Sequence, residues 1–130
     1  MRKILMILAC ATVLLSGCRE SFDARLKREC QENTQKFYPQ QIAADIREDS
    51  VVFNDKTRTL THCYTLSGVI DTLYNDTERQ ICHEQYVNAV KSDVSLEEIR
   101  ENGVNVEFLY FSAKSGKEVL RLLITENDYK

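Results

Sequence analysis

The feature that most constrains the fold is a pair of apolar segments near the C-terminal end. They read VNVEFLYF at residues 104–111 and KEVLRLLIT at residues 117–125. β-Branched and aromatic residues are frequent in them, which is typical of strands. The five residues between them, SAKSG, end in a glycine that can take the positive φ of a tight turn. The sequence therefore predicts a β-hairpin in this region.

The first of these segments is apolar at odd and at even positions. Val106, Phe108 and Tyr110 alternate with Leu109 and Phe111. Successive side chains of a strand point to opposite faces, so both faces of this part of the sheet are expected to be at least partly covered. A central strand inside a covered sheet explains the pattern. Cover by the N-terminal segment, by a second copy of the chain or by a partner is the alternative that we keep.

Two more strands and two helices are predicted upstream of the hairpin. Residues 50–53 and 58–67 are interpreted as strands joined by a turn at residues 54–57. Helical periodicity predicts helices over residues 21–37 and 72–91. Ser21 is a suitable N-cap for the first helix, which is expected to end before Pro39.

The predicted order is thus α-β-β-α-β-β, which indicates an α+β fold. We expect a four-stranded antiparallel sheet with two helices packed on one face. A short helical turn that begins at Ser95 and ends at Gly103 precedes the C-terminal hairpin.

Residues 32–68 and 102–125 resemble a widespread group of small exported bacterial α+β proteins of unassigned function. The matching positions are Pro39, Ile42, Asp49, Ser50, Ser115, Gly116 and the segment HCYTL at residues 62–66. His62 stands where that group has a tyrosine, and an aspartate that often follows Ile42 is replaced by alanine. The resemblance supports the fold and implies no activity.

The N-terminal end is organised like a bacterial signal peptide. Arg2 and Lys3 precede residues 4–15, which are apolar apart from one threonine. This stretch is too short to span a bilayer, which takes about 20 apolar residues. It ends in Leu-Ser-Gly-Cys18, which resembles the lipobox of bacterial lipoproteins. That resemblance implies a diacylglycerol on the Cys18 thiol, cleavage before Cys18, and acylation with a palmitate-type chain at the new amino terminus.

We therefore predict a signal peptide at residues 1–17 and a single lipid-anchored α+β domain at residues 18–130. The expected location is the bacterial cell envelope, facing the periplasm, because two or three acyl chains anchor a protein stably to a membrane. Arg19, rather than an aspartate, follows the cysteine. Under the retention rule of some bacteria this favours the outer membrane.

Three cysteines remain once Cys10 leaves with the signal and Cys18 carries lipid. In an oxidising compartment, an odd number permits one disulfide and one free thiol. Cys30 and Cys82 fall on the apolar sides of the predicted helices, and neighbouring helices can bring such residues within bonding distance. We favour a Cys30–Cys82 disulfide over Cys63–Cys82. In the chain-entropy model, a loop of about 50 residues contributes about 4 kcal/mol.

No catalytic residue, cofactor or metal site is predicted. The cysteines lack the Cys-x-x-Cys spacing of a thiol oxidoreductase. Two adjacent pairs, His62–Cys63 and Cys82–His83, suggest metal ligands at first. Adjacent strand residues point to opposite faces, however, and adjacent helix residues diverge by about 100°, so the four side chains are not expected to converge.

The charge of the mature chain argues against nucleic acid as a partner. Without Arg2 and Lys3, the 17 basic residues become 15 against 20 acidic ones, a formal charge of about −5. We expect a non-catalytic envelope lipoprotein that presents a small domain for protein–protein interaction or homodimerisation. Its role would be in envelope assembly, secretion support or inhibition of another protein. The alternative is a periplasmic ligand-binding or sensory module that uses the open sheet face.

Overall fold

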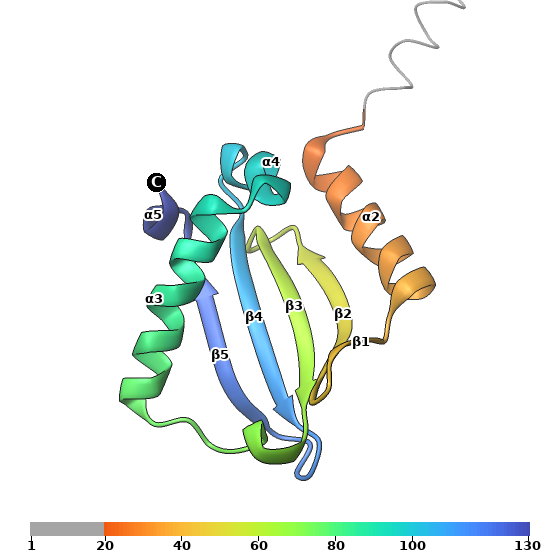
Figure 1. Ribbon diagram of the computed structural model, residues 1–130. Helices are drawn as coiled ribbons and strands as arrows, with labels where there is room; N and C mark the ends of the chain where they lie inside the picture. The colour runs from red at the N-terminus through yellow and green to blue at the C-terminus, as the bar shows by residue number, and fades with distance from the viewer. Residues whose placement is uncertain (1–19) are drawn as a thin grey trace, which may run out of the picture.

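The computed structural model describes residues 20–130, so Cys18 and the predicted signal peptide lie outside the described residues. Figure 1 shows a twisted sheet flanked by helices. The elements in chain order are α2 (Phe22–Phe37), β1 (Gln40–Ala43), β2 (Ile46–Asn54), β3 (Thr59–Leu66), η1 (Gly68–Ile70), α3 (Asp76–Ser92), η2 (Val94–Leu96), α4 (Glu97–Glu101), β4 (Asn105–Ser112), β5 (Glu118–Ile124) and α5 (Glu126–Tyr129).

The sheet has five strands in the order β1-β2-β3-β4-β5. Strands β3 and β4 are parallel, whereas the other neighbours are antiparallel. The predicted α+β class is therefore confirmed. The prediction of four antiparallel strands is wrong, because the sheet has a fifth strand and is mixed.

The parallel pair follows from the length of the connection between β3 and β4. Helix α3 has 17 residues, which at about 1.5 Å per residue is about 26 Å. An eight-residue strand has nearly the same length, at about 3.3 Å per residue. The helix thus returns the chain to the end of the sheet where β3 began, and β4 then runs in the same direction. This connection is a β-α-β crossover. The sequence predicted antiparallel pairing of all neighbouring strands and did not predict this crossover.

Strand β1 was missed because its four residues, QQIA, are all exposed and carry no alternating pattern. Its partner β2 is longer than the predicted residues 50–53. A β-bulge between Glu48 and Ser50 breaks the alternation of β2. Since a bulge puts one extra residue into a strand, the period-2 signal fails at that point.

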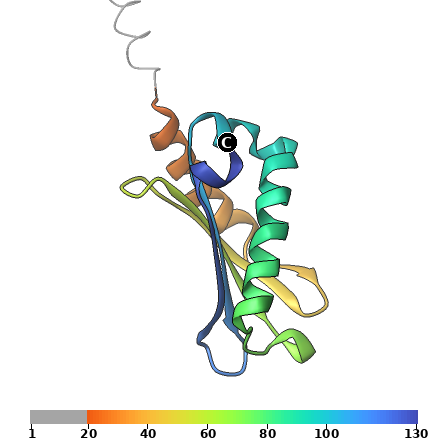
Figure 2. The same cartoon turned by 90° about the vertical axis from the view of Figure 1, so that its left-hand side faces the viewer.

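Helices α2 and α3 cover the same face of the sheet. Phe53, Leu60, Val106 and Ile124 are neighbours across β2, β3, β4 and β5. They form one buried cluster that also includes Cys30 of α2 and Val90 of α3. A second cluster, at the other end of the sheet, packs against the first half of α3 and consists of Tyr64, Leu66, Tyr110, Val119, Leu120 and Leu122. Figure 2 shows the sheet nearly edge on, with α3 along one side.

The two outer strands of the sheet are both protected. At one edge, β1 is only four residues long. At the other, α3 supplies side chains to the backbone of β5: Arg79 donates to the Val119 carbonyl at 3.3 Å, and His83 Nε2 lies 3.0 Å from the Leu123 carbonyl. Unpaired strand edges invite pairing with other chains, so both arrangements disfavour it.

Candidate functional site

A groove lies between α2 and the segment formed by η2 and α4, with β2 and β3 as its floor. In Figure 1, α2 lies at the β2 side of the sheet and α3 at the β5 side. The groove has a volume of about 280 Å³. We call it the α2 groove; its lining residues are Phe22, Arg25, Leu26, Glu29, Cys30, Asn33, Tyr38, Val51, Leu60, His62, Ser95, Leu96, Glu98 and Ile99.

Helix α2 is held beside the groove by a few specific polar contacts. Thr34 Oγ1 donates to the Val51 carbonyl at 2.8 Å and accepts from the Val51 amide at 3.1 Å. Arg58 binds both carboxylate oxygens of Asp23 at 3.0 Å. Across the mouth of the groove, Arg25 of α2 pairs with Glu98 of α4.

His62, in the floor of the α2 groove, contacts Glu48, and the two form a partly buried pair of ionisable groups. Glu48 Oε2 is 3.7 Å from His62 Nδ1, and the two side chains are 13% and 21% exposed. Contact with His62, followed by the hydroxyls of Tyr38 and Tyr64, lowers the pKa of Glu48 to about 2 despite burial. Burial and the nearby Glu48 carboxylate raise the pKa of Tyr38 to about 12. Nδ1 of His62 has no hydrogen-bond partner.

Next to this pair, aromatic side chains pack into a ladder. Tyr64 stacks on Tyr110 with ring centroids 4.7 Å apart, and His62 stacks on Phe108 at 5.5 Å. Tyr86 of α3 meets Phe108 edge to face at 4.8 Å, and its hydroxyl pairs with that of Tyr110. Burial raises the pKa of Tyr64 and of Tyr110. Tyr64 and Tyr110 are therefore core residues, and Tyr86 is half-buried against them.

The two histidines do not come together. His62 is in the floor of the α2 groove, whereas His83 lies on α3 against the Leu123 carbonyl of β5. Within residues 20–130, no three His, Cys, Asp or Glu side chains are placed to hold a metal ion. None of the helices over this range is long and apolar enough to cross a membrane.

Cys30, Cys63 and Cys82 are free thiols in the structure. Cys30 belongs to the cluster beneath α2, and Cys82 lies at the border of the other cluster, beneath α3. The three thiols are unbonded in the structure, and the Cys30–Cys82 disulfide stays a prediction. Burial raises the pKa of the Cys30 thiol to about 11, so this thiol is a poor nucleophile at neutral pH.

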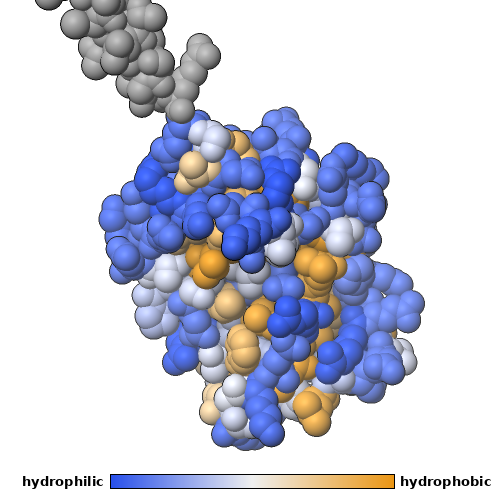
Figure 3. Space-filling model, turned by 180° about the vertical axis from the view of Figure 1, so that it is seen from behind, coloured by the Kyte–Doolittle hydropathy of each residue, from blue (hydrophilic) through white to orange (hydrophobic). Residues whose placement is uncertain are grey.

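The other face of the sheet mixes polar and apolar side chains. Arg121 of β5 binds Glu107 at 3.0 Å and Glu118 at 2.7 Å. On the same face, Val52 and Leu123 are 52% and 41% exposed. Figure 3, which views the molecule from behind, shows hydrophobic patches among hydrophilic surface. The sequence indicated apolar side chains on this face, because residues 104–111 are apolar at odd and at even positions.

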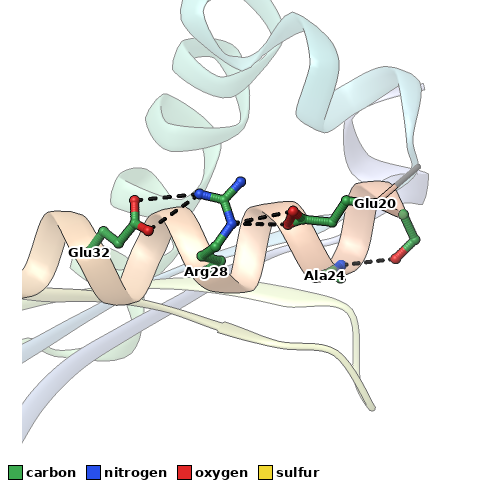
Figure 4. Close-up of polar contacts among 5 residues, drawn as sticks. Glu20, Ala24, Arg28 and Glu32 are labelled. Atoms are coloured by element: carbon green, nitrogen blue, oxygen red, sulfur yellow. Dashed lines mark hydrogen bonds and ion pairs between the residues drawn. The ribbon is translucent and has the colours of Figure 1, made fainter. Parts of the chain in front are cut away.

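At the start of the described chain, the backbone enters α2 without a linker. Ser21 caps the helix by accepting from the Ala24 amide at 3.2 Å. Figure 4 shows Arg28 between Glu20 and Glu32 on the surface of α2. The distances from Arg28 to the two carboxylates are 3.1 and 3.3 Å. Glu20 is therefore fixed to the helix that follows it.

Comparison with known proteins gives two solved structures with this fold. A predicted secreted protein from Pseudomonas aeruginosa is 13% identical and superimposes with a TM-score of 0.64, over 86% of this chain and all of that one. EpsS, the pilotin of the type 2 secretion system of Vibrio vulnificus, is 9% identical with a TM-score of 0.57, over 83% of this chain and 94% of EpsS. At such identities the similarity shows the fold alone.

A search of curated protein sequences gives no match. Among protein families, a domain of unknown function named DUF8479 matches residues 21–121. The match begins at the N-cap of α2 and includes all five strands, apart from the last three residues of β5. The chain therefore belongs to the DUF8479 family of domains of unknown function.

Proposed function

We propose that the protein is a non-catalytic lipoprotein of the bacterial cell envelope whose domain binds another protein, in support of a secretion system or of envelope assembly. The observation that carries this proposal is the α2 groove. Its floor and walls are largely apolar, with Leu26, Leu60 and Ile99 among the lining residues, and its mouth carries the Arg25–Glu98 ion pair. Apolar pockets with a charged border are typical of sites that take a partner's side chains.

The polar groups of the groove support binding rather than catalysis. His62, which lines the groove, is stacked on Phe108 and contacts the ionised carboxylate of Glu48. A nucleophile oriented by a base and a third group is the usual arrangement of covalent catalysis. The groups in this groove are engaged in packing and charge pairing instead.

The proposed location rests on Cys18 as a lipid attachment site. Glu20, two residues further on, is already bound to α2 through Arg28. Two residues span at most about 7 Å, so a lipidated Cys18 would hold the first turn of α2 next to the bilayer. The shared fold with a secretion pilotin and with a predicted secreted protein is consistent with this setting. The outer membrane is the proposed membrane.

The binding function is tested by crosslinking the lipidated protein in its own envelope, purifying it and identifying partners by mass spectrometry. Leu26→Glu puts a charge into the α2 groove and is expected to abolish recovery of the partner. Ile81→Glu, on the exposed side of α3, is the matched control and should retain it. Far-UV circular dichroism checks that both variants fold. If the unmodified protein recovers no specific partner, the proposed function is wrong.

The anchor is tested separately by Cys18→Ser. We expect this variant to leave the membrane fraction, because the acyl chains are the only membrane attachment that we propose. A variant that remains membrane-bound after washing with high salt would contradict the lipid anchor.

A further inference from the structure

We propose a second binding surface at the end of the domain opposite the start of α2. It would take an extended protein segment in which a large apolar side chain is flanked by carboxylates. The surface is a groove of about 350 Å³ between the loop that follows η1 and the β4–β5 hairpin. We call it the distal groove; the residues that matter to it are Asp71, Leu73, Lys114, Lys117, Glu118 and Val119.

The distal groove is lined by Leu73, an unusually exposed apolar side chain, and Val69 of η1 lies four residues before it. Val69 and Leu73 are 90% and 77% exposed, and they are two of the three most exposed large apolar residues in the described part of the chain. The groove itself reaches Val119, which is only 4% exposed. Single exposed apolar residues are common on protein surfaces. Leu73 is different because it lies beside buried Val119 in a groove, where it offers a partner an apolar contact.

The loop that carries these side chains is fixed in place. The Asp71 amide donates to the Gly68 carbonyl at 3.2 Å, and the Tyr74 hydroxyl donates to the Ile70 carbonyl at 3.1 Å. The Asp71 carboxylate accepts from the Lys114 amide at 3.2 Å, which ties the loop to the β4–β5 hairpin. Leu73 is thus displayed from a preorganised surface, and a partner would lose less entropy in ordering it.

The charges of the distal groove favour an acidic partner. Both carboxylates in the groove are already engaged: Asp71 by the hairpin backbone, and Glu118 by Arg121 at 2.7 and 2.9 Å. Within residues 20–130, no carboxylate lies within 4 Å of the ammonium group of Lys114 or of Lys117. Lys114 acts on the Asp71 carboxylate only from beyond ion-pair distance. An incoming Asp or Glu would therefore meet two ammonium groups that are free to form an ion pair.

The position of the distal groove favours a protein over a lipid surface. In Figure 1, η1 and the β4–β5 hairpin lie side by side at the bottom, whereas α2 begins at the top. If Cys18 is lipidated, as proposed above, the distal groove faces away from the bilayer and is open to proteins in the periplasm. Only this orientation depends on the proposed anchor. The apolar contact and the two free lysines do not.

The test uses the lipidated protein in nanodiscs and a fluorescein-labelled peptide of sequence DELFED, followed by fluorescence anisotropy. We expect saturable binding that weakens with added salt, since charge pairs at a surface are screened. Lys114→Glu/Lys117→Glu and Leu73→Ser should each weaken binding about tenfold or more. Lys36→Glu/Lys56→Glu reverses two other exposed lysines and is the matched control, which should bind as the parent does. The peptides KKLFKK and DESSED should bind much more weakly.

Equal affinity of DELFED for the parent and for the Lys114→Glu/Lys117→Glu variant would overturn the proposal. The proposal would also be overturned if heparin competed with DELFED and bound the Leu73→Ser variant equally well. The surface would then be a general anion site. These results do not depend on the α2 groove. If DELFED does not bind but a partner is still captured in the envelope, the distal-groove proposal is wrong and the proposed function stands.

Discussion

Replacing Glu48 by glutamine should reveal how much the ionised carboxylate beside His62 stabilises the fold. The pKa of Glu48 is lowered from 4.5 to about 2. At about 1.4 kcal/mol per pKa unit, this corresponds to about 3 kcal/mol. The side chain is 13% exposed, so screening by water is limited, but the His62 nitrogen at 3.7 Å is beyond hydrogen-bond distance. The amide of glutamine also keeps part of the contact with Tyr38 and Tyr64. We therefore expect Glu48→Gln to lower the free energy of unfolding at pH 7 by about 2 kcal/mol.

The pH dependence gives the sign of this effect. The pKa of Glu48 is lower in the folded protein than in the unfolded chain, so its ionisation stabilises the fold above about pH 4.5. The stabilisation is lost as the pH falls through that range towards 2. The parent and the Glu48→Gln variant should therefore differ most near pH 7 and converge near pH 2.

Urea unfolding followed by far-UV circular dichroism measures both quantities, since the chain has no tryptophan. Glu97→Gln is the matched control: it removes an exposed carboxylate of α4 and should leave the pH dependence almost unchanged. If parent and Glu48→Gln lose the same stability between pH 5 and pH 2.5, ionised Glu48 does not stabilise the fold and the reasoning fails.

Three further predictions concern the core, a tight turn and the thiols. Leu122→Ala should cost about 2–5 kcal/mol of unfolding free energy, whereas Leu123→Ala on the other face should cost less than about 1 kcal/mol, because the two side chains are 2% and 41% exposed; equal losses in urea unfolding would contradict the assigned faces. Gly68→Ala should destabilise more than Gly116→Ala, since both have positive φ but a Cβ at Gly68 would lie 2.8 Å from the Asp45 carboxylate, and one at Gly116 meets nothing; thermal unfolding midpoints decide this. Cys30 should resist alkylation in the folded protein and react after unfolding without reductant, because its thiol is buried and its pKa is raised to about 11; peptide mapping that finds it joined to Cys82 would instead support the disulfide predicted from the sequence.

The sequence predicted those elements whose periodicity is strong. The strand predicted at residues 58–67 corresponds to β3, Thr59–Leu66, and the C-terminal hairpin corresponds to β4 and β5. It did not predict β1, which is polar and exposed, or the full length of β2, in which a bulge interrupts the alternation. The parallel pairing of β3 with β4 was missed for another reason, because local patterns carry no information on which strands become neighbours.

The candidate site shows the same limit. His62 and Tyr64 fall in the strand predicted at residues 58–67, but the sequence did not connect Glu48 with them. It lies directly across from Tyr64 in the β2–β3 ladder, in a register that depends on the bulge. Only the pairing of two strands places its carboxylate beside His62.

The protection of the β5 edge has a consequence for crowding. A protein tethered to a membrane diffuses in two dimensions, where the distance between copies is short and the effective concentration is high. Under those conditions an unpaired strand edge would hydrogen-bond to the same edge of another copy and extend the sheet between molecules. If Cys18 is lipidated as proposed, Arg79 and His83, which occupy carbonyls of β5, would let many copies share one membrane surface and remain separate molecules.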